Sequence, residues 1–230
     1  MSVIVLDLET FASDHAAEFV EKPNLDAILP AGNLKDPEKI AASIAERKAA
    51  ALDGYKASLG RAALDWNLSR IVAIGYHLSG EPEPRCEVAR TEAEEASMLR
   101  WFWSLKGTAH IVGFNARNFD VPTLIQRSRL LGVPHPRVSL ARFGRGDVLD
   151  VYDELTFEGA RGAGIMPQSL KAFARRFGLP VSDPTNGKDI AQLVASEDWE
   201  GVRSHCLSDV DLTRELAVRI GLVKPWARVA

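Results

Sequence analysis

Short apolar runs that end in polar residues, a pattern typical of buried β-strands, punctuate the first two thirds of the chain. The run at residues 3–6 is rich in β-branched side chains and is followed at once by a carboxylate. Similar runs predict strands at 70–78 and 110–114, a weaker strand at 85–90, and a fifth at 147–151.

Apolar residues three and four apart predict helices between and after these strands. Thr91 and Glu94 fit a capping box that opens a helix through Leu99 and Phe102 to Gly107. Strands that come first and then alternate with helices favour one α/β domain with a mixed sheet. The further helices are expected between the 110–114 strand and residue 132, and at 167–177, 187–195 and 198–220.

Roughly sixty residues separate the first two strands, where a hairpin turn would suffice. Asp36 and Pro37 fit an N-cap and a first helical residue, and apolar residues recur at helical spacing after them. We therefore predict a helical insert at about residues 21–67 within a single domain that covers residues 1–230.

The composition is ordinary for a soluble globular protein, with 46% hydrophobic and 26% charged residues. The 28 Lys and Arg against 31 Asp and Glu give a formal net charge of −3. This balance argues against a protein held on nucleic acid by bulk positive charge, but it is compatible with a locally basic groove.

Localisation follows from the cysteines and the N-terminus. Cys86 and Cys206 are too few for a disulfide scaffold and fit a reducing compartment. The start MSVIVLDLET has no basic lead, and no apolar run approaches the roughly 20 residues that span a bilayer. We expect a cytoplasmic protein with no membrane partner.

Asp7 and Glu9 are two positions apart at the end of the first strand, so their side chains share a face. Such carboxylates repel each other unless a cation lies between them, and hard divalent cations prefer oxygen ligands. For this pair alone, a strand end that emerges into solvent is an equally good explanation.

The segment GFNARNFDVP at residues 113–122 leaves a strand, crosses a polar loop and enters a helix. Asp120 falls near the first helical turn, where it fits either a metal ligand or a helix cap. Asn115 has the alternative of a turn-forming side chain, and Phe119 is expected to pack in the core.

His205 and Asp209 on the last helix are four residues apart and therefore share a face. Leu212 and Leu216 continue the same stripe, which indicates that this face turns toward the protein. A structural His–Asp hydrogen bond is the alternative for this pair. Asp211 lies on another face and is a poor candidate for the same site.

Together, these four carboxylates and one histidine match two divalent metals beside a general base, the equipment for attack of water on a phosphodiester. The order D-x-E, N-x-x-x-F-D and H-x-x-x-D resembles the DEDD (DnaQ-like) 3′–5′ exonucleases of the ribonuclease H-like superfamily. LDLET, GFNARNFDVPTL and HCLSDVDLT are most similar to strings in the exonuclease domain of family-B DNA polymerases. The resemblance extends from Asp7 to about Ile220, without the insert.

The resemblance implies a ribonuclease H-like α/β fold whose mixed five-stranded sheet has the order 3-2-1-4-5 and an antiparallel second strand. His205 would orient or deprotonate the attacking water. The polymerase-like branch usually has Tyr at this spacing from the last Asp, and this chain has His. The resemblance therefore supports Asp209 as a metal ligand more directly than it supports His205 as the base. Two Mg²⁺ or Mn²⁺ ions would be bound by Asp7, which bridges both, and by Glu9, Asp120 and Asp209.

Substrate contacts are expected from residues beside these motifs, with Phe11 equally compatible with the core. Residues 115–145 carry six arginines and one acid, so this segment has a charge of +5 and the rest of the chain −8. A solvated basic face and a phosphate-tracking surface are both compatible with it, and Lys171, Arg175 and Arg176 extend either. The candidate substrate contacts are Leu8, Thr10, Phe11, Asn115, Arg117 and Phe119.

These observations favour a stand-alone, metal-dependent 3′–5′ exonuclease that acts on single-stranded DNA ends, as in proofreading or DNA repair. An RNA-trimming 3′–5′ exoribonuclease of the same fold is the alternative within this class. A non-catalytic, polymerase-associated module is the alternative outside it, and the intact set of carboxylates argues against it.

Overall fold

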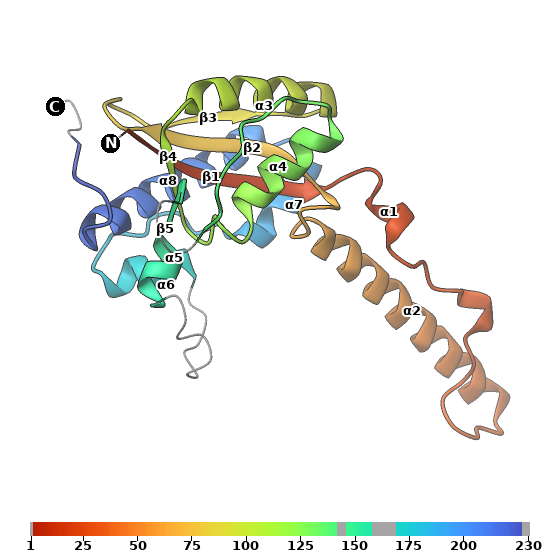
Figure 1. Cartoon of the computed structure of the whole chain (residues 1–230). Coiled ribbons are helices and arrows are strands. Elements are labelled where there is room, and N and C mark those ends of the chain that lie inside the picture. The colour runs from red at the N-terminus through yellow and green to blue at the C-terminus, as the bar shows by residue number, and fades with distance from the viewer. Residues whose placement is uncertain (1, 142–145, 158–168, 227–230) are drawn as a thin grey trace. The chain divides into compact units, whose positions relative to one another are not determined.

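A five-stranded sheet lies in the larger of the two compact units into which the chain divides (Figure 1). Unit 1 comprises Met1–Phe11 and Arg70–Ala230, and unit 2 comprises Ala12–Ser69. The sheet has the order β3-β2-β1-β4-β5, which confirms the predicted order. The computed structural model describes residues 2–141, 146–157 and 169–226.

The strand directions also agree with the prediction. β1 runs parallel to β4, and β4 runs parallel to β5. The Ser79 amide, just after β2, donates to the Val3 carbonyl at 2.9 Å, and the Ser13 amide, just after β1, donates to the Leu68 carbonyl at 2.9 Å, so β2 is antiparallel to β1. β2 is antiparallel to β3 as well. The strands are β1 (Val3–Ala12), β2 (Ser69–Leu78), β3 (Arg85–Val88), β4 (His110–Gly113) and β5 (Val148–Asp150).

The helices of unit 1 begin and end close to the predicted positions. Thr91 caps α3 by accepting from the Glu94 amide at 3.2 Å, and the Glu94 carboxylate turns back to the Arg90 amide. The predicted start of a helix at 167 lies outside the described residues, and the helix in that region is capped by Ser169. The helices are α3 (Glu92–Lys106), α4 (Asp120–Leu130), α5 (Val151–Leu155), α6 (Leu170–Arg176), α7 (Ile190–Ala195) and α8 (Trp199–Arg219), with a 3-10 turn η3 (Gly187–Asp189) before α7.

Alternation along β1 determines which helices meet its two faces. Ile4 and Leu6 belong to the core formed with α3 and α4. Val3 and Val5 belong to the core formed with α6 and α8 on the other face. Positions 7 and 9 continue the second series, so the strand delivers its two carboxylates to the face that α8 covers.

Unit 2 contains the predicted insert helix. It consists of α1 (Ala16–Phe19), a 3-10 turn η1 (Leu25–Ala27) and the long α2 (Pro37–Ala62). Asp36 caps α2 as expected, because its carboxylate accepts from the Glu38 amide at 2.9 Å. The apolar stripe of α2 is only half-buried, and Ala62 is the buried residue of this helix. None of the helices within the described ranges is long and apolar enough to cross a membrane.

Candidate active site

Three elements bring the four predicted carboxylates into one site. Asp7 and Glu9 come from β1, and Asp209 comes from the middle of α8. Asp120, the first residue of α4, accepts a hydrogen bond from the Leu8 amide at 3.2 Å. This bond fixes the second motif beside the first, so that acids more than a hundred residues apart in sequence become neighbours.

The turn that leads to Asp120 depends on a close approach after β4. A Cβ at Gly113 would lie 2.4 Å from the Ala116 Cβ, so only glycine fits this position. Asn115 follows with a φ of 61°, which asparagine tolerates better than most residues. The Asn115 amide donates to Asp150 at 2.9 Å, which ties the turn to the end of β5.

Burial is the largest cause that raises the pKa values of all four carboxyl groups, and neighbouring acids add to the shift. Burial raises the pKa of Asp7 well above its usual value, and the charges of Glu9, Asp209 and Asp120 raise it further. Burial also raises the pKa of Glu9 well above its usual value, with a further contribution from Asp209. The pKa of Asp120 rises to about 7, chiefly through burial, although hydrogen bonds from its own amide and that of Leu8 oppose the shift.

Opposing effects act on the pKa of Asp209. Burial raises its pKa, whereas the nearby charges of His205 and Lys171 lower it. Its Oδ1 atom is buried and has no hydrogen-bond partner within the described part of the chain. A buried carboxylate oxygen without a partner costs free energy unless a cation or water satisfies it.

This donor set fits divalent cations. Over the described residues, no lysine or arginine forms an ion pair with Asp7, Glu9 or Asp120. Clustered, buried carboxylate oxygens with raised pKa values are the donors that Mg²⁺ and Mn²⁺ prefer. We therefore conclude that these acidic groups can hold metal.

His205 lies at the edge of this carboxylate cluster and is 2% exposed. Its Nε2 atom is 3.7 Å from Glu9 Oε1 and 3.9 Å from Asp209 Oδ2. Its Nδ1 atom is 2.6 Å from Asp183 Oδ2. The imidazole therefore has one nitrogen directed at the cluster and the other bonded to a fifth acid.

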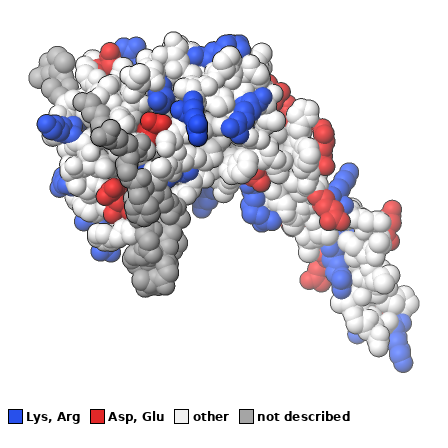
Figure 2. Space-filling model, viewed as in Figure 1, with Lys and Arg blue, Asp and Glu red and all other residues white. Residues whose placement is uncertain are grey.

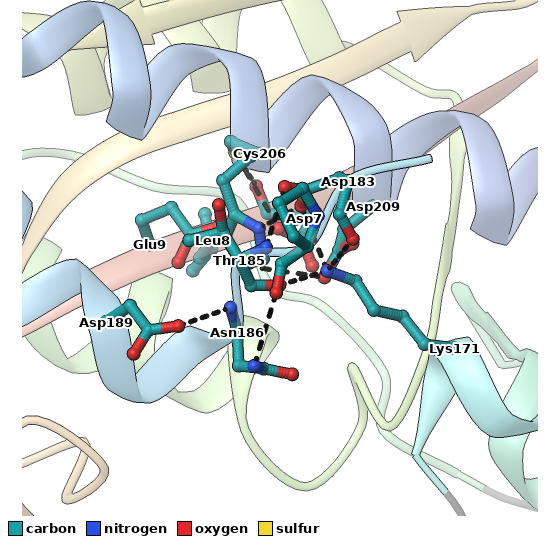
Figure 3. A network of polar contacts seen from close by, with 12 residues as sticks. Asp7, Leu8, Glu9, Lys171, Asp183, Thr185, Asn186, Asp189, Cys206 and Asp209 are labelled. Atoms are coloured by element: carbon teal, nitrogen blue, oxygen red, sulfur yellow. Dashed lines mark hydrogen bonds and ion pairs between the residues drawn. The ribbon is translucent and has the colours of Figure 1, made fainter. Parts of the chain in front are cut away.

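Asp183 is a residue of this site that sequence reasoning missed. It lies in the loop between α6 and η3, and it is held by Lys171, whose Nζ is 2.9 Å from Asp183 Oδ2 (Figure 3). Hydrogen bonds from His205, Lys171 and Thr185 outweigh the effect of burial and hold the pKa of Asp183 well below its usual value. No spacing rule links residue 183 to a helix twenty residues later, and its neighbour Pro184 indicates only a turn.

Cys206 connects α8 to β1 at Asp7. Its thiol donates to the Asp7 carbonyl at 3.6 Å and lies 3.7 Å from the Asp7 carboxylate. Burial raises the pKa of this thiol well above its usual value, and the proximity of Cys86 and Asp7 adds to the shift. The neutral thiol therefore packs against the strand and carries no charge into the carboxylate cluster.

The predicted substrate contacts from the first motif differ in burial. Leu8 is 6% exposed and packs in the core, so its amide, not its side chain, is directed at the site. Thr10 is half-buried. Phe11 is half-buried against the core beside α7, with the Arg70 guanidinium 5.6 Å from its ring centre. Phe119, from the second motif, is half-buried directly before Asp120.

Arg117 is committed to the protein itself. It is 9% exposed, and its guanidinium donates to Asp153 Oδ2 at 2.5 Å and to the Val148 carbonyl at 2.7 Å. Its amide donates to Asp150. The expected contact of Arg117 with substrate therefore competes with a buried ion pair that ties the second motif to β5 and α5.

The arginine-rich segment is less basic on the surface than its sequence suggests. Arg127 is 4% exposed and pairs with Glu92 and Glu95. Arg129 and Arg137 are exposed, whereas Arg142 and Arg145 lie outside the described residues. On the described surface of the face drawn in Figure 2, Lys and Arg side chains are dispersed among acidic ones and form no continuous band.

A family model described as a predicted 3′–5′ exonuclease related to the exonuclease domain of PolB matches residues 64–224, more than half of the chain. The chain belongs to this family. The match contains Asp120, His205 and Asp209, whereas Asp7 and Glu9 precede it. Their place in the site therefore rests on the geometry of β1.

The fold is also similar to that of a solved structure, the family B DNA polymerase from the hyperthermophilic archaeon Pyrobaculum calidifontis, with a TM-score of 0.52 and 19% identity. The similarity covers 96% of this chain and 24% of the polymerase chain, so this chain spans about a quarter of that protein. At this identity the likeness shows the fold alone. Among curated proteins, none matches this chain.

Proposed function

We propose that this member of the exonuclease family removes nucleotides from the 3′ ends of single-stranded DNA, with two divalent cations, Mg²⁺ or Mn²⁺, held by its carboxylates. The observation that carries the proposal is the convergence of Asp7, Glu9, Asp120 and Asp209 from three elements, with a buried Asp209 oxygen that has no hydrogen-bond partner among the described residues. A degenerate, non-binding domain would have no reason to retain four closely placed acids, of which Glu9 and Asp120 are buried and Asp7 and Asp209 half-buried.

The cations would supply charge that stabilises the entering and leaving oxygens of the phosphodiester. Asp7, whose pKa is raised by the charges of the other three acids, would contribute to the binding of both ions, and Glu9, Asp120 and Asp209 would complete the ligand set. The Leu8–Asp120 hydrogen bond keeps one Asp120 oxygen fixed, which leaves the other as a donor.

His205 is proposed as the general base. Its Nε2 atom lies between Glu9 and Asp209, at the edge of the carboxylate cluster. There it would accept a proton from the attacking water. The water oxygen forms a bond to phosphorus, the bond from phosphorus to the 3′ oxygen of the preceding nucleotide breaks, and that oxygen takes a proton from solvent. The products would be a nucleoside 5′-monophosphate and a strand shortened by one nucleotide.

The test is digestion of a single-stranded DNA oligonucleotide labelled separately at each end, in Mg²⁺, in Mn²⁺ and in chelator. We expect a ladder that shortens from the 3′ end, only when metal is present. An RNA oligonucleotide of the same sequence and a blunt duplex are the comparison substrates. Faster digestion of RNA than of DNA would identify RNA as the preferred substrate. No cleavage of any of them would contradict the proposed activity.

Asp209→Ala is the matched loss-of-function variant, and Asp211→Ala on another face of α8 is its control. We expect Asp209→Ala to abolish cleavage while circular dichroism and the melting profile show a folded protein. Asp211→Ala should cleave like the parent chain, because Asp211 lies outside the cluster. Activity that survives in Asp209→Ala would refute the ligand assignment.

A further inference from the structure

The geometry points to Asp183 as a positioning residue that fixes the orientation and tautomer of His205, with Lys171 holding Asp183 in place. This inference rests on the proposed function, because it assigns a task to the imidazole within the same site. Neither the motif order nor the family model's description assigns a role to Asp183 or Lys171.

The His205–Asp183 contact is short and enclosed. Its Nδ1–Oδ2 distance is 2.6 Å, His205 is 2% exposed, and the Asp183 side chain is 14% exposed. Hydrogen bonds between imidazole and an ionised carboxylate are among the stronger ones in proteins, particularly where water is largely excluded. The ring is therefore held in one rotation through Nδ1, the nitrogen that does not point at Glu9 and Asp209.

The same bond determines which nitrogen carries the proton. An ionised carboxylate only accepts hydrogen bonds, so the Nδ1 of His205 must be the donor. In a neutral imidazole this leaves Nε2 with a free lone pair, and Nε2 is the atom 3.7 Å from Glu9 and 3.9 Å from Asp209. Asp183 thus aims a proton acceptor at the place where the attacking water would lie.

Asp183 is itself anchored at both carboxylate oxygens. Oδ1 accepts from the Thr185 amide at 2.9 Å, and Oδ2 accepts from Lys171 Nζ at 2.9 Å as well as from His205. Lys171 also donates to the Asp183 and Thr185 carbonyls, so a single buried ammonium group holds the loop that carries the acid (Figure 3). Lys171 is 7% exposed and acts as a structural anchor, whereas the sequence was compatible with a solvated basic face or a phosphate-tracking surface at this residue.

Metal ligation is the competing role for Asp183. Oxygen or nitrogen atoms of Asp183, His205 and Asp209 lie within 4.8 Å of one another and could hold an ion. The existing bonds to both Asp183 oxygens favour positioning, because a metal would compete for them with Thr185, Lys171 and His205. The two roles predict different results when Asp183 is altered.

A double-mutant cycle separates them. We expect Asp183→Asn, which preserves shape, to lower kcat about 10- to 100-fold with little change in KM or in the metal concentration that gives half-maximal rate. In a His205→Ala background the same change should have almost no further effect, because its consequence acts through the imidazole. Equal losses in both backgrounds, or a large rise in the metal requirement, would overturn the inference.

A matched control lies in the same loop region. Asp189 accepts from the Asn186 amide at 2.8 Å and has no part in the His205 contact. Asp189→Asn should therefore leave kcat unchanged, whereas Lys171→Met should reproduce part of the Asp183→Asn loss. A loss of kcat in Asp189→Asn equal to that in Asp183→Asn would attribute the effect to loop stability and contradict positioning.

Nitrogen-15 NMR of the imidazoles tests the tautomer without any need for nuclease activity. The chain has five histidines, so a spectrum of His205→Ala identifies the His205 signals by their loss. At alkaline pH, where imidazole is neutral, we expect a protonated Nδ1 in the parent chain and a changed tautomer ratio in Asp183→Asn. A protonated Nε2 in the parent would refute the inference, whereas a protein with the expected tautomer that cleaves no nucleic acid would refute only the proposed function.

Discussion

Each acid of the site has an ordinary structural explanation by itself. The energetic cost arises because four acids lie close together. Asp120 alone fits a helix cap, and Asp7 alone fits a strand end. Placed together, Glu9, Asp209 and Asp120 raise the pKa of Asp7, which burial already raises, and one Asp209 oxygen has no hydrogen-bond partner within the described ranges. The protein without metal therefore carries strain at this site, and binding of a cation to the folded state would relieve it.

The strain should appear as pH-dependent stability without metal. The pKa of Asp120 rises from 3.8 to about 7, so between these values the folded state holds a proton that the unfolded state has released. The free energy of unfolding therefore falls as pH rises through this interval, by up to roughly 4 kcal/mol for one such group. In chelator, we expect the melting temperature to be higher at pH 5 than at pH 8.

Divalent cations should reverse this trend. Mg²⁺ or Mn²⁺ should raise the melting temperature more at pH 8 than at pH 5, because protons compete for the same oxygens at the lower pH. Asp120→Asn retains the acceptor for the Leu8 amide and is the matched control, with a weaker dependence on both pH and metal. A metal effect that is equal at the two pH values would contradict the cluster as the binding site.

The sequence predicted the arrangement within whole strands and helices better than it predicted the contacts of single side chains. Alternation along β1 predicted that the side chains at positions 7 and 9 share a face, and helical spacing predicted the same for His205 and Asp209. Both rules act within one regular element, where geometry follows from sequence distance. The sheet order came from a resemblance in motif order, and the structure confirms it.

Such rules do not predict the path of a loop or the burial of a long side chain. Asp183 reaches His205 from an irregular segment, and its direction depends on Lys171 and Thr185, which no periodicity identifies. Arg117 and Arg127 appeared to belong to a basic surface because sequence shows their charge but not their burial. The structure gives each a buried acidic partner, so the charge of this segment is partly cancelled inside the protein.

Arg117 provides a test of this account at the junction of β4, β5 and α5. Arg117→Ala should lower the free energy of unfolding by about 3–5 kcal/mol, because it leaves the carboxylate of Asp153, itself 1% exposed, buried without its partner. Urea denaturation followed by circular dichroism measures this loss. Arg129→Ala, at an exposed position, is the control and should change stability by less than about 0.5 kcal/mol. An Arg117→Ala protein of parental stability but raised KM would instead support the substrate contact.

At the scale of the whole molecule, the effect of the net charge of −3 on nucleic-acid binding depends on where the acidic residues lie. Four of the acids form one cluster, so the site itself repels phosphate until cations bind. Two divalent cations would add four positive charges and bring the net charge to +1. Attraction for a strand end would then be local and dependent on metal, which is consistent with transient capture and not with tight non-specific binding.

The insert belongs to a second compact unit, and the described residues of the proposed site belong to the first. The core residues that pack on the sheet all lie in unit 1, as do the four acids, His205, Asp183 and Lys171. Unit 2 instead carries exposed apolar side chains on its described surface. Those that are large and more than a third exposed are Phe19, Leu29, Leu34, Leu52, Leu64 and Trp66.

Replacement of residues 14–67 by a short glycine-containing turn should therefore leave a folded catalytic unit. The antiparallel ends of β1 and β2 are adjacent, since the Ser13 amide donates to the Leu68 carbonyl at 2.9 Å, and a hairpin turn of two to five residues spans such ends. We expect cooperative thermal unfolding, a melting temperature that still rises with Mg²⁺ or Mn²⁺, and a kcat on a short oligonucleotide within about tenfold of the full chain. The same deletion combined with Asp209→Ala is the control and should lose the metal response. A shortened protein that is insoluble or unfolds without cooperativity would show that unit 2 is required for the fold, because the deletion spares every core residue of unit 1.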